Sequence, residues 1–361
     1  MLLRFIAFLL FWLGLLQGGV SASGLNGLSL TGYRRDAGCG VSVLLLVVGI
    51  VLLLLTPLLP IVLVAIPALL LALLVMGVVS LFVRVEMVPP VAGNPGKDDP
   101  WTAEPISFLD EAGMATGFLL KSHHASANAA TVCWVHGVGD DKENYKWVLA
   151  RALTQRGFNV LTFTLPGHGD RVAEPFTVPD GLSAVPAALD FLRQRADVNP
   201  DRIGLMGVSL GGALSIRALA AGQRVATLAL LEVPCSLHFT DRLWWKEAFR
   251  TVSVPSLNIF RDCSPGGLRR TWNPRSNFAD TLDEVFAELR PEEYMAQVPS
   301  LPLLIVNGGR DPIAPVEHGR RLFARASEPK VHQIVRPASH VSLIFMHKTA
   351  NLVADWFANH L

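Results

Sequence analysis

One serine in the sequence has the surroundings of a catalytic nucleophile. Ser209 lies at the centre of Gly207–Gly211 (GVSLG), after the apolar run Ile203–Met206 and before small residues that begin near Gly212. These patterns predict a buried strand, a helix, and a sharp turn between them at the serine. Glycines two positions before and two positions after Ser209 leave room for that turn. A hydroxyl held there can attack an acyl carbonyl beside the N–H groups that begin the helix.

A serine nucleophile needs a base and an acid that orients the base, and two residues near the C-terminus have suitable positions. Asp311 follows the predicted strand Leu303–Val306 through two glycines, so that a sheet would hold its carboxylate at the rim. His340 follows the predicted strand Val331–Val335, and the pKa of imidazole suits proton transfer near neutral pH. We predict that Ser209 attacks, that His340 takes the proton, and that Asp311 orients His340.

Other residues compete for these roles. Glu232 follows the predicted strand Ala226–Leu231 and is the alternative acid. His136 is the alternative base, although a histidine beside a glycine-rich loop more often shapes the loop by bonding to its backbone. His168, in a Pro-Gly-His-Gly loop, is predicted to be structural. Three further histidines lie within predicted elements and are expected at the surface or in packing: His318, His332 and His347.

A second loop is expected to complete the site. The apolar run Ala129–Val135 predicts a central strand, and it ends in the glycine-bearing segment His136–Asp140. Loops at the carboxyl ends of neighbouring parallel strands meet at one edge of a sheet. We therefore predict that the N–H groups of Val138 and Leu210 bind the oxyanion. The segment lacks the third glycine of a dinucleotide-binding loop.

Composition excludes some functions. The net charge is +1, and no basic stripe or aromatic platform suggests nucleic-acid binding. The four cysteines form no CxxC pair and show no spacing typical of a metal site. The predicted chemistry needs neither a metal nor an organic cofactor.

The order of these motifs resembles that of the α/β-hydrolase superfamily, especially its monoglyceride-lipase-like and serine-aminopeptidase-like branches. The resemblance rests on four segments and extends from about Ile106 to the C-terminus: His136–Gly139, Pro166–Gly169, Asp201–Ile203 and Gly207–Gly212. It implies an α/β fold with a mostly parallel eight-stranded sheet, helices on both faces, and a triad in the order serine, acid, histidine. It does not cover the N-terminal segments and does not fix a substrate.

The elements that position the site are predicted within residues 103–361. A hairpin of Ile106–Leu109 with Met114–Lys121 is expected at one edge, and helices are expected at 143–155, at 182–195 and from His340 to about Asn359. Residues 235–298 form an insertion that is predicted to be a helical cap over the site. Five aromatic residues of the cap are candidates for an acyl pocket or for the cap's own core: Trp244, Trp245, Phe249, Phe260 and Trp272. Three arginines are candidates for binding an anionic head group or for a solvated face: Arg269, Arg270 and Arg275.

The N-terminal 87 residues are predicted to form a membrane region. Mean hydropathy is +0.39, and the excess of apolar residues lies at this end of the chain. Residues 2–20 fit either a cleaved signal peptide or a first transmembrane helix. The uncharged residues 41–83 are too long for one crossing, so we predict a hairpin of two helices that turns near Thr56–Pro60. A turn-rich linker follows at 88–102.

Charge predicts the side of the membrane on which the globular domain lies. Arg34, Arg35 and Arg84 flank the predicted hairpin on the side of that domain, which indicates a cytoplasmic location. Cleavage of residues 2–20 as a signal peptide would instead place the domain outside. The sequence thus predicts a multi-pass membrane protein with a cytoplasmic catalytic domain.

These observations predict a membrane-anchored serine hydrolase that cleaves carboxylic esters through an acyl-enzyme, with lipid-derived esters as a candidate class. The expected partners are a small-molecule or lipid ester substrate and the membrane. Two other functions stay open: a peptidase or amidase that uses the same triad, and a non-catalytic hydrolase-fold module that serves as a membrane scaffold or binding protein.

Overall fold

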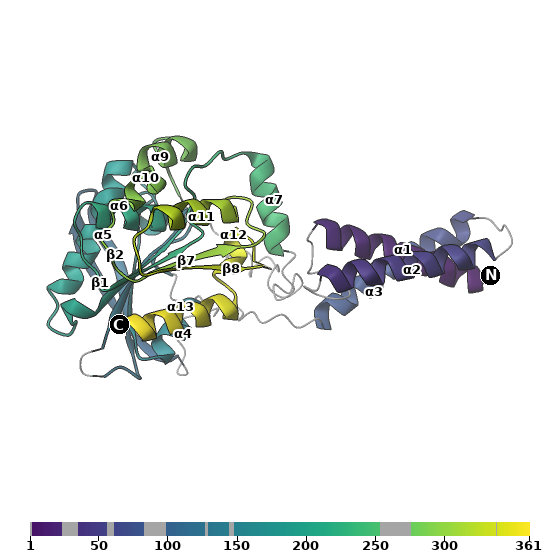
Figure 1. Cartoon of the computed structure of the whole chain (residues 1–361), viewed down its shortest axis with the longest axis horizontal. Coiled ribbons are helices and arrows are strands. Elements are labelled where there is room, and N and C mark those ends of the chain that lie inside the picture. Colours follow the sequence, from purple (N-terminus) through teal and green to yellow (C-terminus); the bar gives the residue numbers. More distant parts are fainter. Residues whose placement is uncertain are drawn as a thin grey trace. The chain divides into compact units, whose positions relative to one another are not determined.

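The computed structural model describes residues 2–23, 35–55, 61–82, 99–126, 129–143, 148–252, 276–336 and 338–361. The chain forms two compact units, one built around three N-terminal helices and the other around a sheet (Figure 1). The predicted turn near residues 56–60 and most of the predicted linker lie outside the described ranges.

An eight-stranded, mostly parallel sheet forms the framework of the larger unit, as predicted. Its strand order is β1-β2-β4-β3-β5-β6-β7-β8. β1 and β2 form the predicted antiparallel hairpin, β2 pairs antiparallel with β4, and the remaining pairs are parallel. The strand bounds are Trp101–Asp110 (β1), Gly113–Ser122 (β2), Thr131–Val135 (β3), Asn159–Phe163 (β4), Ile203–Val208 (β5), Thr227–Leu231 (β6), Leu303–Gly308 (β7) and Lys330–Val335 (β8).

Helices cover both faces of this sheet, which is why its central strands are apolar along their whole length. Every residue of β3, β4, β5, β6 and β7 is buried. Figure 1 shows one group of helices above the sheet and another below it. The first group includes α5 (Val178–Arg193), α6 (Leu210–Ala220) and α11 (Val316–Arg325), and the second consists of α4 (Val148–Gln155) and α13 (His347–His360).

Two helices differ from their predicted bounds. α5 begins at Val178 rather than at 182, because Thr177 accepts a hydrogen bond from the N–H of Asp180 and thereby caps an earlier start. The final helix is divided into α12 (His340–Leu343) and α13. His340 therefore begins a short helix, at the position where the sequence had predicted the final helix to begin.

The described parts of the segment between β6 and β7 contain helices together with bends and two isolated bridge residues, Ser276 and Phe278. The segment contains α7 (Asp241–Val252), α9 (Leu282–Leu289) and α10 (Pro291–Met295). A reciprocal pair of hydrogen bonds between Thr281 and Glu284 fixes the start of α9. The five aromatic residues that were candidates for an acyl pocket or the cap's core, and the three arginines that were candidates for binding a head group or for a solvated face, lie outside the described side chains. The role of this segment as a cap stays a prediction.

The smaller unit contains α1 (Leu2–Ser23), α2 (Arg35–Leu54) and α3 (Ile61–Phe82), and its bounds also include Ala248–Ser264, with the end of α7. Glycines bring α1 and α2 into close contact: a Cβ on Gly14 would lie 2.8 Å from the Cγ of Leu46, and one on Gly49 would lie 2.7 Å from the backbone N of Phe11. The hydroxyl of Ser42 donates to the carbonyl of Gly14 at 2.8 Å. Small residues in this arrangement let helix backbones approach closely.

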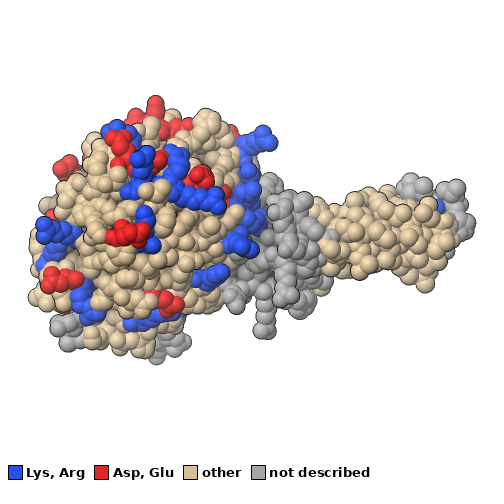
Figure 2. Space-filling view, viewed as in Figure 1, with Lys and Arg blue, Asp and Glu red and all other residues tan. Residues whose placement is uncertain are grey.

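The outer surface of this unit is apolar. Large apolar side chains on all three helices are exposed, among them Leu2, Leu54 and Leu70. On the face that Figure 2 shows, the unit carries almost no charged side chain, whereas acidic and basic side chains are mixed over the larger unit. Within the described ranges one helical stretch, Leu2–Gly19, is long and apolar enough to cross a membrane, while those in α2 and α3 are shorter. Of the several membrane-spanning helices that were predicted, length and composition therefore support one, α1.

Candidate active site

Ser209 occupies a strained turn between β5 and α6. Its φ of +49° and ψ of −114° lie outside the regions that residues other than glycine ordinarily adopt. The flanking glycines are required by close approach: a Cβ on Gly207 would lie 2.5 Å from the Cα of Gly212, and one on Gly211 would lie 2.3 Å from the carbonyl oxygen of Val135. The local sequence thus forces the serine into this geometry, as the pattern of glycines predicted.

The structure brings the three predicted catalytic side chains into one hydrogen-bonded row. The Nε2 of His340 lies 3.1 Å from the Oγ of Ser209, and its Nδ1 lies 2.7 Å from the Oδ2 of Asp311. The three side chains come from the carboxyl ends of β5 and β7 and from the segment that follows β8. This is the geometry in which an imidazole removes a proton from a serine hydroxyl while a carboxylate holds the imidazole.

The backbone fixes the carboxylate of Asp311. Its Oδ1 accepts hydrogen bonds from the N–H groups of Ile313 at 2.7 Å and Ala314 at 2.8 Å. Asp311 is only 5% exposed, so these bonds are shielded from water. Because Oδ1 is held in this way, rotation of the carboxylate is restricted and Oδ2 is directed at the imidazole.

Two opposing effects act on the pKa of His340. Burial by itself lowers the pKa, because it disfavours the charged imidazolium. The negative charge of Asp311, its hydrogen bond and the other buried carboxylates nearby together outweigh burial, and the pKa lies above the ordinary histidine value. These carboxylates therefore make the imidazole a stronger base, which is the property that a general base beside a serine hydroxyl needs.

Glu232, the alternative acid, lies beside the triad, but the carboxylate that is hydrogen-bonded to the imidazole of His340 is that of Asp311. It follows β6 with a φ of +47° and is 2% exposed, and its Oε2 has no hydrogen-bond partner. Burial raises the pKa of Glu232 well above the usual glutamate value, which favours the neutral acid. Ligand atoms of Glu232, Asp311 and His340 lie within 4.8 Å of one another. The three groups are close enough together to bind a metal ion, but two of them, Asp311 and His340, are hydrogen-bonded to each other.

His136 and His168 have structural positions, as predicted. Both are fully buried. The N–H of Leu165 donates to the Nε2 of His136 at 3.0 Å, so its Nδ1 carries the hydrogen that bonds to the carbonyl of Gly137 at 2.7 Å. Burial lowers the pKa of His136 to about 4 and that of His168 to about 3, so both are neutral near pH 7. His136 thereby ties the loop after β3 to the loop after β4.

The predicted oxyanion donors lie next to the nucleophile. A Cβ on Gly137 would lie 3.3 Å from the Cβ of Ser209, which places the loop after β3 against the serine. Val138 lines the same cavity as Ser209. Leu210 is the first residue of α6, where backbone N–H groups have no partner within the helix. An assignment of these two N–H groups as donors stays a prediction.

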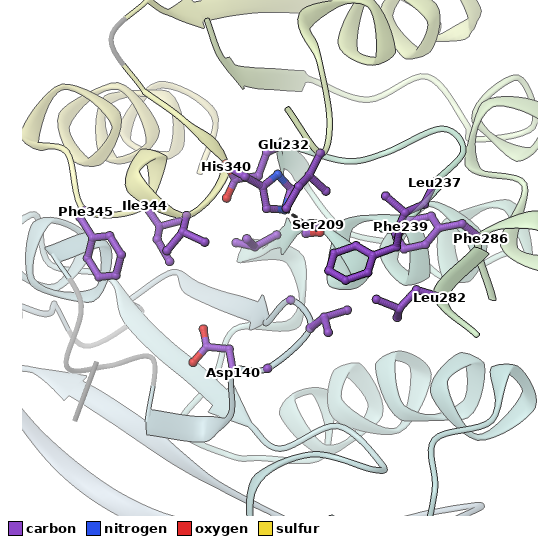
Figure 3. Close-up of a pocket in the computed structure, with 16 residues that line it drawn as sticks. Asp140, Ser209, Glu232, Leu237, Phe239, Leu282, Phe286, His340, Ile344 and Phe345 are labelled. Atoms are coloured by element: carbon purple, nitrogen blue, oxygen red, sulfur yellow. Dashed lines mark hydrogen bonds between the residues drawn. The ribbon is translucent and has the colours of Figure 1, made fainter. Parts of the chain in front are cut away.

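An apolar cavity opens beside Ser209. Its volume is about 150 Å³ within the described part of the chain. Figure 3 shows one group of apolar side chains on one side of Ser209 and a second group on the other, with Asp140 below. The first group consists of Leu237, Phe239, Leu282 and Phe286, and the second includes Ile344 and Phe345.

The sequence had not singled out these lining residues. Leu237 and Phe239 follow β6, and Leu282 and Phe286 are one turn apart on α9. Their spacing of four residues marks one face of a helix. That signal distinguishes a buried face from an exposed one, but it does not say whether the face covers a core or a cavity.

Comparisons with known proteins agree with this fold. A family model for the alpha/beta hydrolase family matches residues 134–355, and the chain belongs to that family. The uncharacterized protein YfhR of Escherichia coli strain K12 is 28% identical over 245 residues, which cover 67% of this chain and 75% of YfhR.

Two solved structures illustrate the range of chemistry on this fold. The esterase Pf2001 of Pyrococcus furiosus has a TM-score of 0.50 at 19% identity, over 75% of this chain and 98% of the esterase. An acylaminoacyl peptidase of Pyrococcus horikoshii has a TM-score of 0.51 at 15% identity, over 73% of this chain and 42% of the peptidase. Such likeness shows the fold, and the reaction has to be argued from the site.

Proposed function

We propose that this protein is a membrane-anchored serine hydrolase that cleaves carboxylic esters through an acyl-enzyme. The observation that carries the proposal is the continuous hydrogen-bonded row from Ser209 through His340 to Asp311. A strained backbone presents the hydroxyl beside an apolar cavity, and the carboxylate at the far end of the row is fixed by the backbone. Chance packing of three polar side chains does not account for these features together.

The reaction follows from this arrangement. The Oγ of Ser209 attacks the ester carbonyl while its proton passes to the Nε2 of His340, and the N–H groups of Val138 and Leu210 stabilise the oxyanion. The imidazolium then gives the proton to the departing alkoxide, which leaves as an alcohol. Water, deprotonated by His340, attacks the acyl-enzyme and releases the carboxylic acid and the free serine.

The cavity indicates the size of the acyl group. An apolar cavity of about 150 Å³ holds a molecule the size of benzene. We therefore propose an apolar acyl group of about six carbons. The lipid-derived class of substrate is supported by the proposed anchor and the apolar lining.

The N-terminal helices support the proposed anchor. Apolar side chains cover the outside of this unit, which is the surface that a bilayer, rather than water, stabilises. The glycine-mediated packing of α1 on α2 supports a first helix that is retained rather than cleaved. We propose that these helices cross the membrane and that the hydrolase unit lies on the cytoplasmic side, where Arg34, Arg35 and Arg84 would also lie.

The full chain in detergent provides the test of the reaction. We expect a fluorophosphonate probe to label wild type but not Ser209→Ala, and we expect hydrolysis of p-nitrophenyl butyrate and hexanoate. Faster cleavage of aminoacyl anilides than of these esters would favour the amidase. Absence of labelling and of both activities would favour a non-catalytic module.

Two separate experiments test the membrane attachment and the side of the membrane on which the hydrolase unit lies. Carbonate washing of membranes should leave the chain in the pellet, and a compartment-sensitive reporter fused after Leu361 should respond as a cytoplasmic protein. Release by carbonate would reject the anchor, and activity of the exported reporter alone would reject the orientation.

A further inference from the structure

A carboxylate from the segment between β6 and β7 holds the backbone of the proposed catalytic histidine. Glu247, in α7, is fully buried. Its Oε2 accepts a hydrogen bond from the N–H of His340 at 3.2 Å, and its Oε1 accepts one from the N–H of Val341 at 2.8 Å. Glu247 and His340 belong to the same compact unit but are 93 residues apart in sequence.

Together with a third hydrogen bond, these bonds hold the backbone N–H groups around His340. The N–H of Ser339 donates to the hydroxyl of Ser342 at 2.7 Å. Three consecutive N–H groups, from Ser339 to Val341, are thus bound by side chains, and two of them by Glu247. These groups begin α12, so no carbonyl within that helix is available to them. The backbone that carries the imidazole is held from α7 as well as from its own helix.

Such a constraint matters because proton transfer depends on position. Displacement of a reacting group by about 1 Å can lower a rate about 10²-fold. The imidazole of His340 must meet Ser209 and Asp311 at the same time. A shift of its backbone would weaken both contacts.

We propose that Glu247 is a positioning residue through which α7 holds His340 in line with Ser209. The proposal rests on the proposed serine hydrolase function. It makes the catalytic row depend on the position of Asp241–Glu247, the part of α7 that belongs to the larger unit and lies in the segment predicted to cover the site. Glu247 touches neither the substrate nor the reacting atoms in this scheme, and it acts through the backbone of His340.

Variants of Glu247 test this role in the full chain. Active sites are counted with a fluorophosphonate probe, and kcat and KM are measured with p-nitrophenyl butyrate. We expect Glu247→Ala to lower kcat per labelled site about 10²-fold with KM within about threefold of wild type. Glu247→Gln keeps one acceptor oxygen and should recover part of this loss. Lys246→Ala, an exposed position on the same helix, is the matched control and should behave as wild type.

A pH profile separates positioning from a merely structural role. Burial lowers the pKa of His340, and the negative charges of Asp311 and Glu247 raise it, as does Glu232 when its carboxyl group is ionised. Both Glu247 variants remove one of these charges. The midpoint of kcat/KM against pH should therefore move to lower pH in both, as should the NMR titration of the His340 imidazole.

Two results would overturn the proposal. One is wild-type kcat per labelled site with an unshifted midpoint. The other is a loss confined to the number of labelled sites, since that would mean that Glu247 serves folding alone. A wild-type chain that neither labels nor hydrolyses esters would instead overturn the proposed function, and the imidazole titration would still decide whether Glu247 acts on His340.

Discussion

Replacing Asp311 by asparagine is expected to abolish most of the activity by fixing the wrong tautomer of His340. The N–H groups of Ile313 and Ala314 donate to Oδ1 and require an oxygen there. In Asp311→Asn the amide oxygen must take that place, which leaves the amide nitrogen facing the Nδ1 of His340. Because an amide nitrogen only donates, Nδ1 would have to accept, and the hydrogen would move to Nε2. An Nε2 that carries hydrogen cannot take the proton of Ser209.

The expected loss is large. The same exchange of acid for amide in serine proteases lowers kcat about 10⁴-fold, which is about 5 kcal/mol of transition-state stabilisation. Folding should change little, since asparagine keeps the size of aspartate and the acceptor for both N–H groups. The measurement is kcat with p-nitrophenyl butyrate per folded molecule, with thermal unfolding as the check on folding. Asp190→Asn, at an exposed position on α5, is the control and should keep wild-type activity.

The comparison with Glu232→Gln tests the choice of acid. Glutamine has nearly the shape of the neutral glutamic acid, so we expect a loss of less than about tenfold in kcat. If Asp311→Asn kept more than about a tenth of wild-type kcat while Glu232→Gln lost most of it, the orientation of His340 by Asp311 would be refuted and Glu232 would be the acid.

Three further results are expected. The value of kcat/KM should rise with pH through a midpoint above the ordinary histidine pKa of about 6.5, because His340 acts as a base only when neutral and its pKa is raised. Gly211→Ala should cost about 1–3 kcal/mol in the free energy of unfolding and lower activity, since its Cβ would lie 2.3 Å from the carbonyl oxygen of Val135. Arg171→Ala should cost about 3–5 kcal/mol in a denaturation assay, because it leaves the fully buried carboxylate of Asp110 without its two-pronged partner.

Each of these results has a contrary outcome. A midpoint below the ordinary histidine value would mean that burial, rather than the charge of Asp311, dominates at His340. Unchanged stability of Gly211→Ala would mean that the turn at Ser209 can widen. An Arg171→Ala variant as stable as wild type would mean that water reaches Asp110.

Local patterns in the sequence were enough to predict the framework and the three residues of the row. The turn at Ser209 depends on glycines within two positions of it. The same local sequence therefore indicates the turn and makes it possible. Asp311 and His340 each follow a strand, and adjacent parallel strands end at one edge of a sheet. The buried central strands were predictable because strands covered on both faces are apolar throughout.

Contacts between distant segments were decided only by the tertiary structure. Glu232 and Asp311 both follow strand ends, and the sequence left both as candidates for the acid. The choice depends on side-chain direction: the backbone of Glu232 has a φ of +47°, whereas two N–H groups turn Asp311 toward the imidazole. The bond from Glu247 to His340 joins segments 93 residues apart, and no local pattern marks it. Spacing along the chain shows which residues follow the end of a strand, but only packing determines which of their atoms come within hydrogen-bonding distance.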